Sequence, residues 1–216
     1  MPQTWIDAVK GKMMNFDVSG RKGHLDVQEA RSLTPKEATY WYKQSDLLEI
    51  DELRSLAADK VIRQIVGRYL GCEPVFDFSV AWWSFPFGDG ADSDAAQLYH
   101  FDLDRVRWLK VFVYLTDVEI YNGPHAFISG SHKNIGKKIW HEGRYSDEEV
   151  FKLYKKENEV IFTAPAGTIF IEDTLGFHKG CSVKEGKRLV FEFELSINHF
   201  GYPHPRTRLD AKETNL

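Results

Sequence analysis

The stretch LYHFDLDRVRWLKVFVYLTDV (residues 98–118) joins a strongly apolar run to a cluster of ionisable side chains at its start. Residues 107–117 have the β-branched and aromatic composition of a buried strand. Ahead of them stand His100, Asp102 and Asp104, spaced two residues apart. Because a buried charge is costly unless it is paired or coordinates an ion, these side chains either face water in a loop or hold a metal.

Other short runs of β-type composition lie on both sides of this strand. They are rich in Val, Ile, Phe, Tyr and Trp and are separated by turn residues such as Gly and Pro. A series of this kind is typical of a β-sandwich or jelly roll. We therefore predict a mainly β fold with a jelly-roll core over residues 75–200, whose strands cover 75–85, 96–101, 107–117, 125–130, 159–164, 167–173 and 187–197.

The N-terminal part has a different pattern. Residues 34–71 carry apolar side chains at helical spacing, with Thr34 as a candidate N-cap, Pro35 at the first helical position and Gly71 at the end. We predict that residues 1–72 form a mainly helical support that packs on one sheet of the core.

A charged insert, residues 132–159, separates two of the predicted strands. Within it, Ser146 followed by Glu149 forms the capping-box pattern of a helix start. An exposed, solvated surface is the simpler interpretation of the charges in this insert. Loops at this place in similar folds often cover the substrate, so the insert is also a candidate lid.

Composition limits the classes of function. With 216 residues, 43% of them apolar, the chain can close one sizeable core, and we expect a single domain over residues 1–216. A net charge of −4 gives no basic surface for nucleic acid or an anionic membrane, so neither is an expected partner. Cys72 and Cys181 lack the spacing of a disulfide framework, and no segment has the pattern of a signal peptide or membrane span. The expected location is the cytoplasm.

A jelly roll brings residues from distant strands into one cavity, where a second histidine can join the first cluster. The candidate is His178 in AGTIFIEDTLGFHKG (166–180), which follows a strand and a turn glycine. With His100 and Asp102 it makes two imidazoles and one carboxylate, the set that holds Fe(II) and leaves three positions open in non-haem oxygenases. An HxD triplet alone carries little information, since the chain has eight histidines.

Arg188 strengthens the metal interpretation. It stands ten residues after His178, at the start of the next predicted strand. A planar guanidinium is suited to bind a carboxylate through two hydrogen bonds. An inward arginine without a charge partner is costly, which indicates that its partner is a ligand.

The order of these motifs resembles the phytanoyl-CoA dioxygenase family of Fe(II)/2-oxoglutarate-dependent oxygenases. The matching elements lie within about residues 75–200 and are the HxD triplet, NGPHAFISGSHK (122–133), the segment with the distal histidine, and Arg188. The resemblance implies a double-stranded β-helix, iron bound by His100, Asp102 and His178, and the distal carboxylate of 2-oxoglutarate bound by Arg188. His132 in the GSH element is expected to be a turn residue rather than a ligand.

The resemblance also implies a reaction. An enzyme of this kind uses O₂ and 2-oxoglutarate to hydroxylate a C–H bond of a small-molecule substrate, and it releases succinate and CO₂. Related halogenases lack the metal-binding carboxylate, so Asp102 favours hydroxylation, or another oxidation such as desaturation, over halogenation. Two alternatives remain: a cupin-like metal enzyme that does not use 2-oxoglutarate, and a non-catalytic jelly-roll binding module. Neither of them requires an inward Arg188.

The sequence departs from the family pattern near the cosubstrate. Many members have Ser or Thr two residues after the distal histidine, where this chain has Gly180. Lys110 is a candidate replacement, because strand alternation places it on the same face as Phe112, which the resemblance puts in the cavity. The alternative for Lys110 is a solvated position at a sheet edge. Glu192 is expected to point inward, where it could balance Lys110 or meet a cationic substrate.

Four further residues receive expected positions. Trp82 and Trp83 are neighbours on one predicted strand, so only one can face the cavity, and Trp83 is our candidate. His125, after the NGP turn, is a second candidate cavity residue. Asp104 is expected to cap the turn that follows the HxD triplet.

Overall fold

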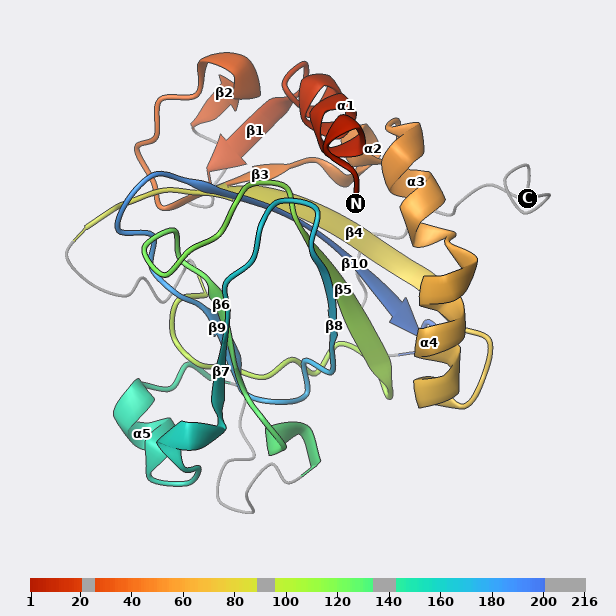
Figure 1. Ribbon diagram of the computed structural model, residues 1–216, viewed down its shortest axis with the longest axis vertical. Helices are drawn as coiled ribbons and strands as arrows, with labels where there is room; N and C mark the ends of the chain where they lie inside the picture. The colour runs from red at the N-terminus through yellow and green to blue at the C-terminus, as the bar shows by residue number, and fades with distance from the viewer. Residues whose placement is uncertain (21–25, 89–95, 134–142, 201–216) are drawn as a thin grey trace.

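Two β-sheets and a layer of helices make up the computed structural model, which describes residues 1–20, 26–88, 96–133 and 143–200 (Figure 1). The larger sheet has seven strands in the order β2-β1-β3-β4-β10-β5-β8, and the smaller has three in the order β7-β6-β9. The strand bounds in the larger sheet are β1 Asp17–Gly20, β2 Val27–Glu29, β3 Thr39–Tyr42, β4 Val75–Ser84, β5 Trp108–Tyr114, β8 Ile169–Glu172 and β10 Arg188–Ser196. Those in the smaller sheet are β6 His125–Ile128, β7 Glu159–Phe162 and β9 His178–Gly180.

The pairing of these strands confirms the predicted mainly β, jelly-roll fold. Each described pair is antiparallel, and β10 lies between β4 and β5 in the larger sheet. The smaller sheet stands across from β5 and β8 (Figure 1). Residues of the two sheets can therefore converge on the space between them.

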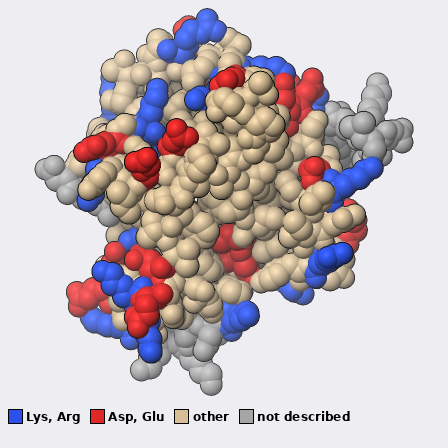
Figure 2. Space-filling model, in the orientation of Figure 1, with Lys and Arg blue, Asp and Glu red and all other residues tan. Residues whose placement is uncertain are grey.

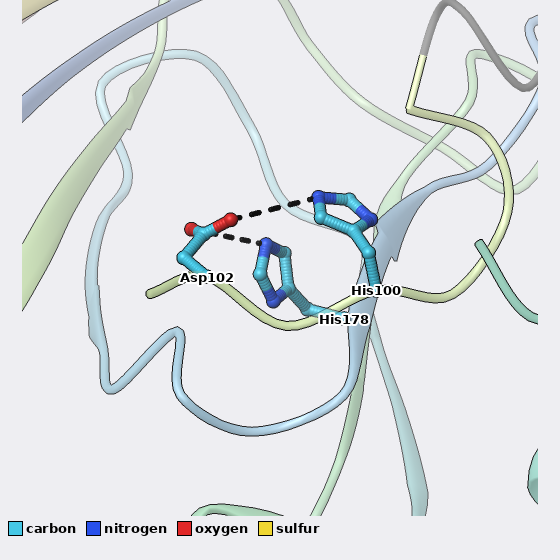
Figure 3. Close-up of side chains that lie close together, drawn as sticks. All are labelled: His100, Asp102 and His178. Carbon is cyan, nitrogen blue, oxygen red and sulfur yellow. Dashed lines mark ion pairs between the residues drawn. The ribbon is translucent and has the colours of Figure 1, made fainter. Parts of the chain in front are cut away.

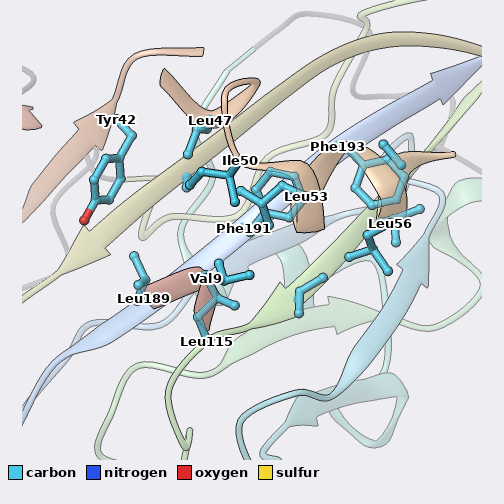
Figure 4. Close-up of a cluster of buried hydrophobic side chains, with 14 of the residues drawn as sticks. Val9, Tyr42, Leu47, Ile50, Leu53, Leu56, Leu115, Leu189, Phe191 and Phe193 are labelled. Carbon is cyan, nitrogen blue, oxygen red and sulfur yellow. The ribbon is translucent and has the colours of Figure 1, made fainter. Parts of the chain in front are cut away.

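Strand alternation divides the larger sheet into an apolar face and a cavity face. Every residue of β5 and β10 is buried. Leu189, Phe191 and Phe193 of β10 pack in the main core beneath the helices (Figure 4). Val190 of the same strand belongs to a second cluster with Phe112, on the opposite face. Burial of each large apolar side chain stabilises the folded state by about 1.5–3 kcal/mol.

Helices cover the apolar face of the larger sheet. They are α1 Gln3–Met13, α2 Gln44–Leu47, α3 Asp51–Ala57 and α4 Lys60–Leu70. In α4, the Asp59 carboxylate accepts hydrogen bonds from two first-turn amides, and Gly71 ends the helix with a φ of 82°. The predicted stop at Gly71 is confirmed. No helix of the described residues is long and apolar enough to cross a bilayer.

The N-terminal part differs from the prediction. Its 34–44 segment contains β3 instead of a helix, and β1 and β2 were not predicted, whereas α1 agrees with the mainly helical prediction for residues 1–72. The sequence Thr-Tyr-Trp-Tyr at 39–42 is β-branched and aromatic, and it pairs with both β1 and β4. Residues 1–72 thus supply three strands to the large sheet as well as the helices that cover it.

The charged insert is only partly described. It contains the short turns η2 Ser131–Lys133 and η3 Lys156–Asn158 and the helix α5 Asp147–Phe151, whose Ser146 and Glu149 form the predicted capping box. Charged side chains of both signs gather around α5 at the lower left of Figure 2. Residues 134–142 of the candidate lid lie outside the described residues.

Candidate active site

Backbone pairing brings the HxD triplet beside β9. His100 and His178 exchange amide-to-carbonyl hydrogen bonds of 3.0 and 2.9 Å, and the Asp102 amide donates to the Thr174 carbonyl at 2.8 Å. The three side chains therefore point toward one another (Figure 3). Asp102 Oδ1 lies 4.0 Å from His100 Nε2, and Asp102 Oδ2 lies 3.6 Å from His178 Nε2. One possible ligand atom from each residue lies within 4.8 Å of the others.

The protonation states of these groups suit a metal. His100 Nδ1 lies 3.0 Å from the Leu98 carbonyl and His178 Nδ1 lies 2.9 Å from the Gly176 carbonyl, so each Nδ1–H donates and each Nε2 lone pair is free to bind a metal. Burial lowers the pKa of both imidazoles, which favours their neutral form. Burial alone would raise the pKa of Asp102, but Lys110 together with His178 and His100 outweighs this effect and the pKa falls. Two neutral imidazoles and one carboxylate fit Fe(II).

A buried carboxylate that was not predicted lies next to His178. Glu172 is 5% exposed; its Oε1 is 3.8 Å from His178 Nδ1, and its Oε2 is 2.8 Å from His125 Nε2. The His125 ring stacks on the His178 ring with 5.6 Å between their centroids. His125 lines the cavity, as expected from the sequence. The alternation in IFIE, which puts Phe170 and Glu172 on one face, was the signal that could have revealed Glu172.

A cavity of about 750 Å³ lies between the sheets and is within the size range of small-molecule sites. Its wall includes the expected Phe112 and Glu192. The expectation for Trp83 is wrong. Trp83 packs in the core beneath the helices, where its Nε1 donates to the Tyr42 hydroxyl at 3.0 Å. Trp82 lines the cavity instead, because it pairs with the inward residue Val190 across the sheet, and it stacks on Trp41 at 4.8 Å.

Arg188 also lines the cavity and is only 5% exposed. Its guanidinium donates to the Gly123 carbonyl and, at 3.2 Å, to the Ser84 hydroxyl. Within the described part of the chain, the side chain of Arg188 has these two oxygens as its hydrogen-bond partners and no carboxylate, and its Nε has no partner. Burial lowers its pKa. A buried cation of this kind is suited to receive an anionic ligand.

Ser84 was not predicted, and it occupies a place that the sequence assigned to Lys110. A Cβ atom added to Gly180 would lie 3.1 Å from Arg188 Nη2, so glycine leaves room for the guanidinium. The hydroxyl expected near that position comes from Ser84, which is paired with Arg188 across β4 and β10. Only knowledge of the strand register could have indicated this residue.

Lys110 does point into the cavity, and it is 8% exposed, which excludes the solvated alternative. Its expected role beside Arg188 is wrong. Lys110 Nζ lies 2.7 Å from Asp102 Oδ2, 2.9 Å from Asp104 Oδ2 and 3.6 Å from Glu192 Oε1. In the sheet it faces Glu194, six residues along β10 from Arg188, which corresponds to roughly 20 Å of strand. Asp104 is correspondingly an ion-pair partner of Lys110, beyond its expected role at the turn.

Two glutamates of β10 share this region. Burial raises the pKa of Glu192 to about 7 and that of Glu194 to about 10. Burial opposes the charge of Lys110 as well, but the surrounding carboxylates, Asp102 first, raise its pKa above the usual range. At neutral pH the cluster therefore holds a charged ammonium, an ionised Asp102 and a protonated Glu194.

Glu194 gives a testable pH dependence. Because its pKa is raised to about 10, the folded state binds more protons than the unfolded state between its ordinary value and pH 10, so stability falls as pH rises through this window. We expect the wild-type protein to lose about 4 kcal/mol of unfolding free energy between pH 5 and pH 8 that Glu194→Gln does not lose, because each pH unit in this window costs about 1.4 kcal/mol. Urea unfolding at both pH values measures this. Glu185→Gln, at an exposed site, should keep the wild-type profile, and an equal slope in Glu194→Gln would contradict the assignment.

Comparisons with known proteins place the fold. No family model and no curated protein matches the sequence. Among solved structures, HygX from Streptomyces hygroscopicus, with nickel, 2-oxoglutarate and hygromycin B bound, gives a TM-score of 0.63 at 14% identity, over 93% of this chain and 81% of that one. The non-haem, α-ketoglutarate-dependent carbocyclase SnoK from nogalamycin biosynthesis gives a TM-score of 0.61 at 16% identity, over 90% of this chain and 76% of that one. EctD from S. alaskensis with bound Fe gives a TM-score of 0.58 at 16% identity, over 91% of this chain and 69% of that one. The chain therefore shares the jelly-roll fold of these three proteins.

Proposed function

We propose that this protein is an Fe(II)/2-oxoglutarate-dependent oxygenase that oxidises a C–H bond of a small-molecule substrate. One observation carries the proposal: the buried set His100, Asp102 and His178 shares a cavity with Arg188, a buried cation that has no carboxylate partner among the described residues. A metal site alone would leave that cation unexplained. A fold shared with enzymes that bind nickel or iron, and in one case 2-oxoglutarate, supports the same function.

Each residue receives a role from its position. His100, Asp102 and His178 would hold Fe(II), and Arg188, with the Ser84 hydroxyl beside it, would bind the distal carboxylate of 2-oxoglutarate. When bound, iron with 2-oxoglutarate and O₂ supplies the oxidising power to break a C–H bond, with release of succinate and CO₂. The aromatic pair Trp41 and Trp82 forms a cavity wall suited to a flat or apolar face of the substrate.

The motif order favours placement in the phytanoyl-CoA dioxygenase family, and the retained carboxylate Asp102 favours hydroxylation or desaturation over halogenation. A family name does not define the substrate, because the residues of the site set it. The cavity is lined by both aromatic and charged side chains, so the substrate we propose is a small molecule with an apolar face and polar groups. A panel of such molecules, assayed for stimulated succinate formation, would identify its class.

The proposal is tested by adding Fe(II) and 2-oxoglutarate to the purified protein without oxygen. We expect a visible charge-transfer band that appears only when both are present, because chelation of the metal by the keto acid requires the open positions of the site. Succinate in place of 2-oxoglutarate is the control and should give no band. Metal binding without the band would favour the cupin-like alternative, and absence of metal binding would favour a non-catalytic module.

A further inference from the structure

The carboxylate of Asp102 is held on one side by a lysine. Lys110 Nζ lies 2.7 Å from Asp102 Oδ2 and donates a hydrogen bond to it. The other oxygen, Oδ1, is the one nearer to His100, at 4.0 Å from Nε2. Oδ2 also lies 3.6 Å from His178 Nε2, so each oxygen of the carboxylate faces an imidazole, but only Oδ2 contacts the ammonium.

The ammonium is fixed in this position by its other contacts. Asp104 Oδ2 at 2.9 Å and Glu192 Oε1 at 3.6 Å lie around the same nitrogen. Lys110 starts from β5, in the interior of the larger sheet between β10 and β8, where it faces Glu194 and Glu172. A side chain with these partners and 8% exposure is not free to turn away from Asp102.

The number of oxygens that Asp102 gives to a metal determines what else can bind. A carboxylate can bind a cation through one oxygen or through both. With one oxygen, the three side chains leave three positions open on an octahedral ion, two for a chelating 2-oxoglutarate and one for O₂. With both oxygens, only two positions stay open, and 2-oxoglutarate fills them.

We propose that Lys110 is a positioning residue that occupies Oδ2 of Asp102, so that this carboxylate binds the metal through one oxygen and the position for O₂ stays open. The inference rests on the proposed function, since it concerns the same metal. It also accounts for the pair of aspartates spaced two apart: Asp102 is the candidate ligand, and Asp104 balances the lysine that holds it.

This role predicts effects of opposite direction in one variant. Lys110→Met keeps most of the apolar stem but removes the charge and the hydrogen bond. Loss of a nearby positive charge favours cation binding, and a second oxygen becomes available to the metal. Metal affinity should therefore rise by about tenfold, while the metal loses the open position that would take O₂. A merely structural lysine would lower metal affinity when replaced.

The probe is Mn(II), and the readout is the number of water molecules bound to it, measured by pulsed EPR in ¹⁷O-labelled water. For wild type we expect three such waters, falling to one when 2-oxoglutarate is added. For Lys110→Met we expect two, falling to none, with 2-oxoglutarate affinity within about threefold of wild type because Arg188 is untouched. Lys179→Met is the matched control: Lys179 is also 8% exposed and pairs with Asp147, outside the cavity wall. It should keep three waters.

The outcomes separate the two proposals. A wild-type protein that binds neither Mn(II) nor 2-oxoglutarate overturns the proposed function and the inference with it. A wild type that binds both, with the same water count and metal affinity in Lys110→Met, overturns the inference alone. Should Lys110→Met fail to fold, a crystal structure of the Co(II)-loaded wild type decides: a free Asp102 oxygen bonded to Lys110 supports the inference, and both oxygens on the metal overturn it.

Discussion

His178→Ala should reduce Fe(II) affinity by more than about 100-fold and bring 2-oxoglutarate-dependent succinate formation to background. Loss of a residue that merely orients a metal ligand costs up to about 100-fold in metal affinity, and loss of a ligand itself should cost more. The imidazole is prepared for this role, because its Nδ1–H is bonded to the Gly176 carbonyl and its Nε2 faces Asp102. Anaerobic calorimetry with Fe(II) measures the affinity directly.

The fold of this variant should survive. The main core lies between the helices and the outer face of the larger sheet, and His178 is not part of it. We expect the metal-free variant to keep its unfolding free energy within about 1 kcal/mol of wild type. His132→Ala is the matched control, since His132 lies in the GSH element outside the cavity wall, and it should retain wild-type Fe(II) affinity. Normal iron binding by His178→Ala would remove this residue from the ligand set.

The jelly-roll core and the site that it carries were largely readable from the sequence. Strand alternation is a local property, so the inward side of β5 and β10 follows from the order of apolar and charged residues, and Lys110, Phe112 and Glu192 do line the cavity. The pairing of His100 with His178 follows from motif order in a known architecture. Both predictions need only the local alternation of apolar and polar residues and the assumption of a jelly-roll topology.

The partners of charged residues were less predictable. The sequence places Lys110 in the cavity but does not say which residue of the neighbouring strand lies opposite it. It therefore could not decide whether Lys110 contacts Asp102 or supports Arg188. Register decides it, because Lys110 is opposite Glu194 while Arg188 is opposite Ser84. Glu172 was missed for a different reason: alternation in IFIE places it inward, but its partners His125 and His178 belong to the other sheet and cannot be identified from that pattern.

The N-terminal part shows a different limit. Apolar spacing predicted a helix from Thr34, whereas Thr39–Tyr42 forms a strand that extends the large sheet and places Trp41 on Trp82. Pairing with β4 outweighs the local pattern here. The choice between Trp82 and Trp83 depended on the N-terminal helices. These helices cover the face of the sheet on which Trp83 lies, so Trp83 is in the core.

Arg188→Lys should raise the apparent KM for 2-oxoglutarate on the order of 100-fold, because it keeps the charge but loses the planar pair of donors that fits a carboxylate. The present guanidinium is oriented by the Gly123 carbonyl and the Ser84 hydroxyl. A lysine ammonium is a point charge on a flexible stem and cannot use both contacts in the same way. Steady-state succinate formation at varied 2-oxoglutarate measures the change.

Iron affinity separates cosubstrate binding from general damage in this variant. The hydrogen bonds of the Arg188 side chain go to Gly123 and Ser84, and none of them involves His100, Asp102 or His178, so Fe(II) affinity should stay within about threefold of wild type. Arg107→Lys is the matched control, since the Arg107 guanidinium also bonds backbone carbonyls, those of Leu70 and Tyr69, but lies outside the cavity wall. It should leave both values unchanged. An Arg188→Lys enzyme with an unchanged KM would show that the carboxylate of 2-oxoglutarate binds elsewhere, and the buried guanidinium would then be a structural cation held by Gly123 and Ser84 alone.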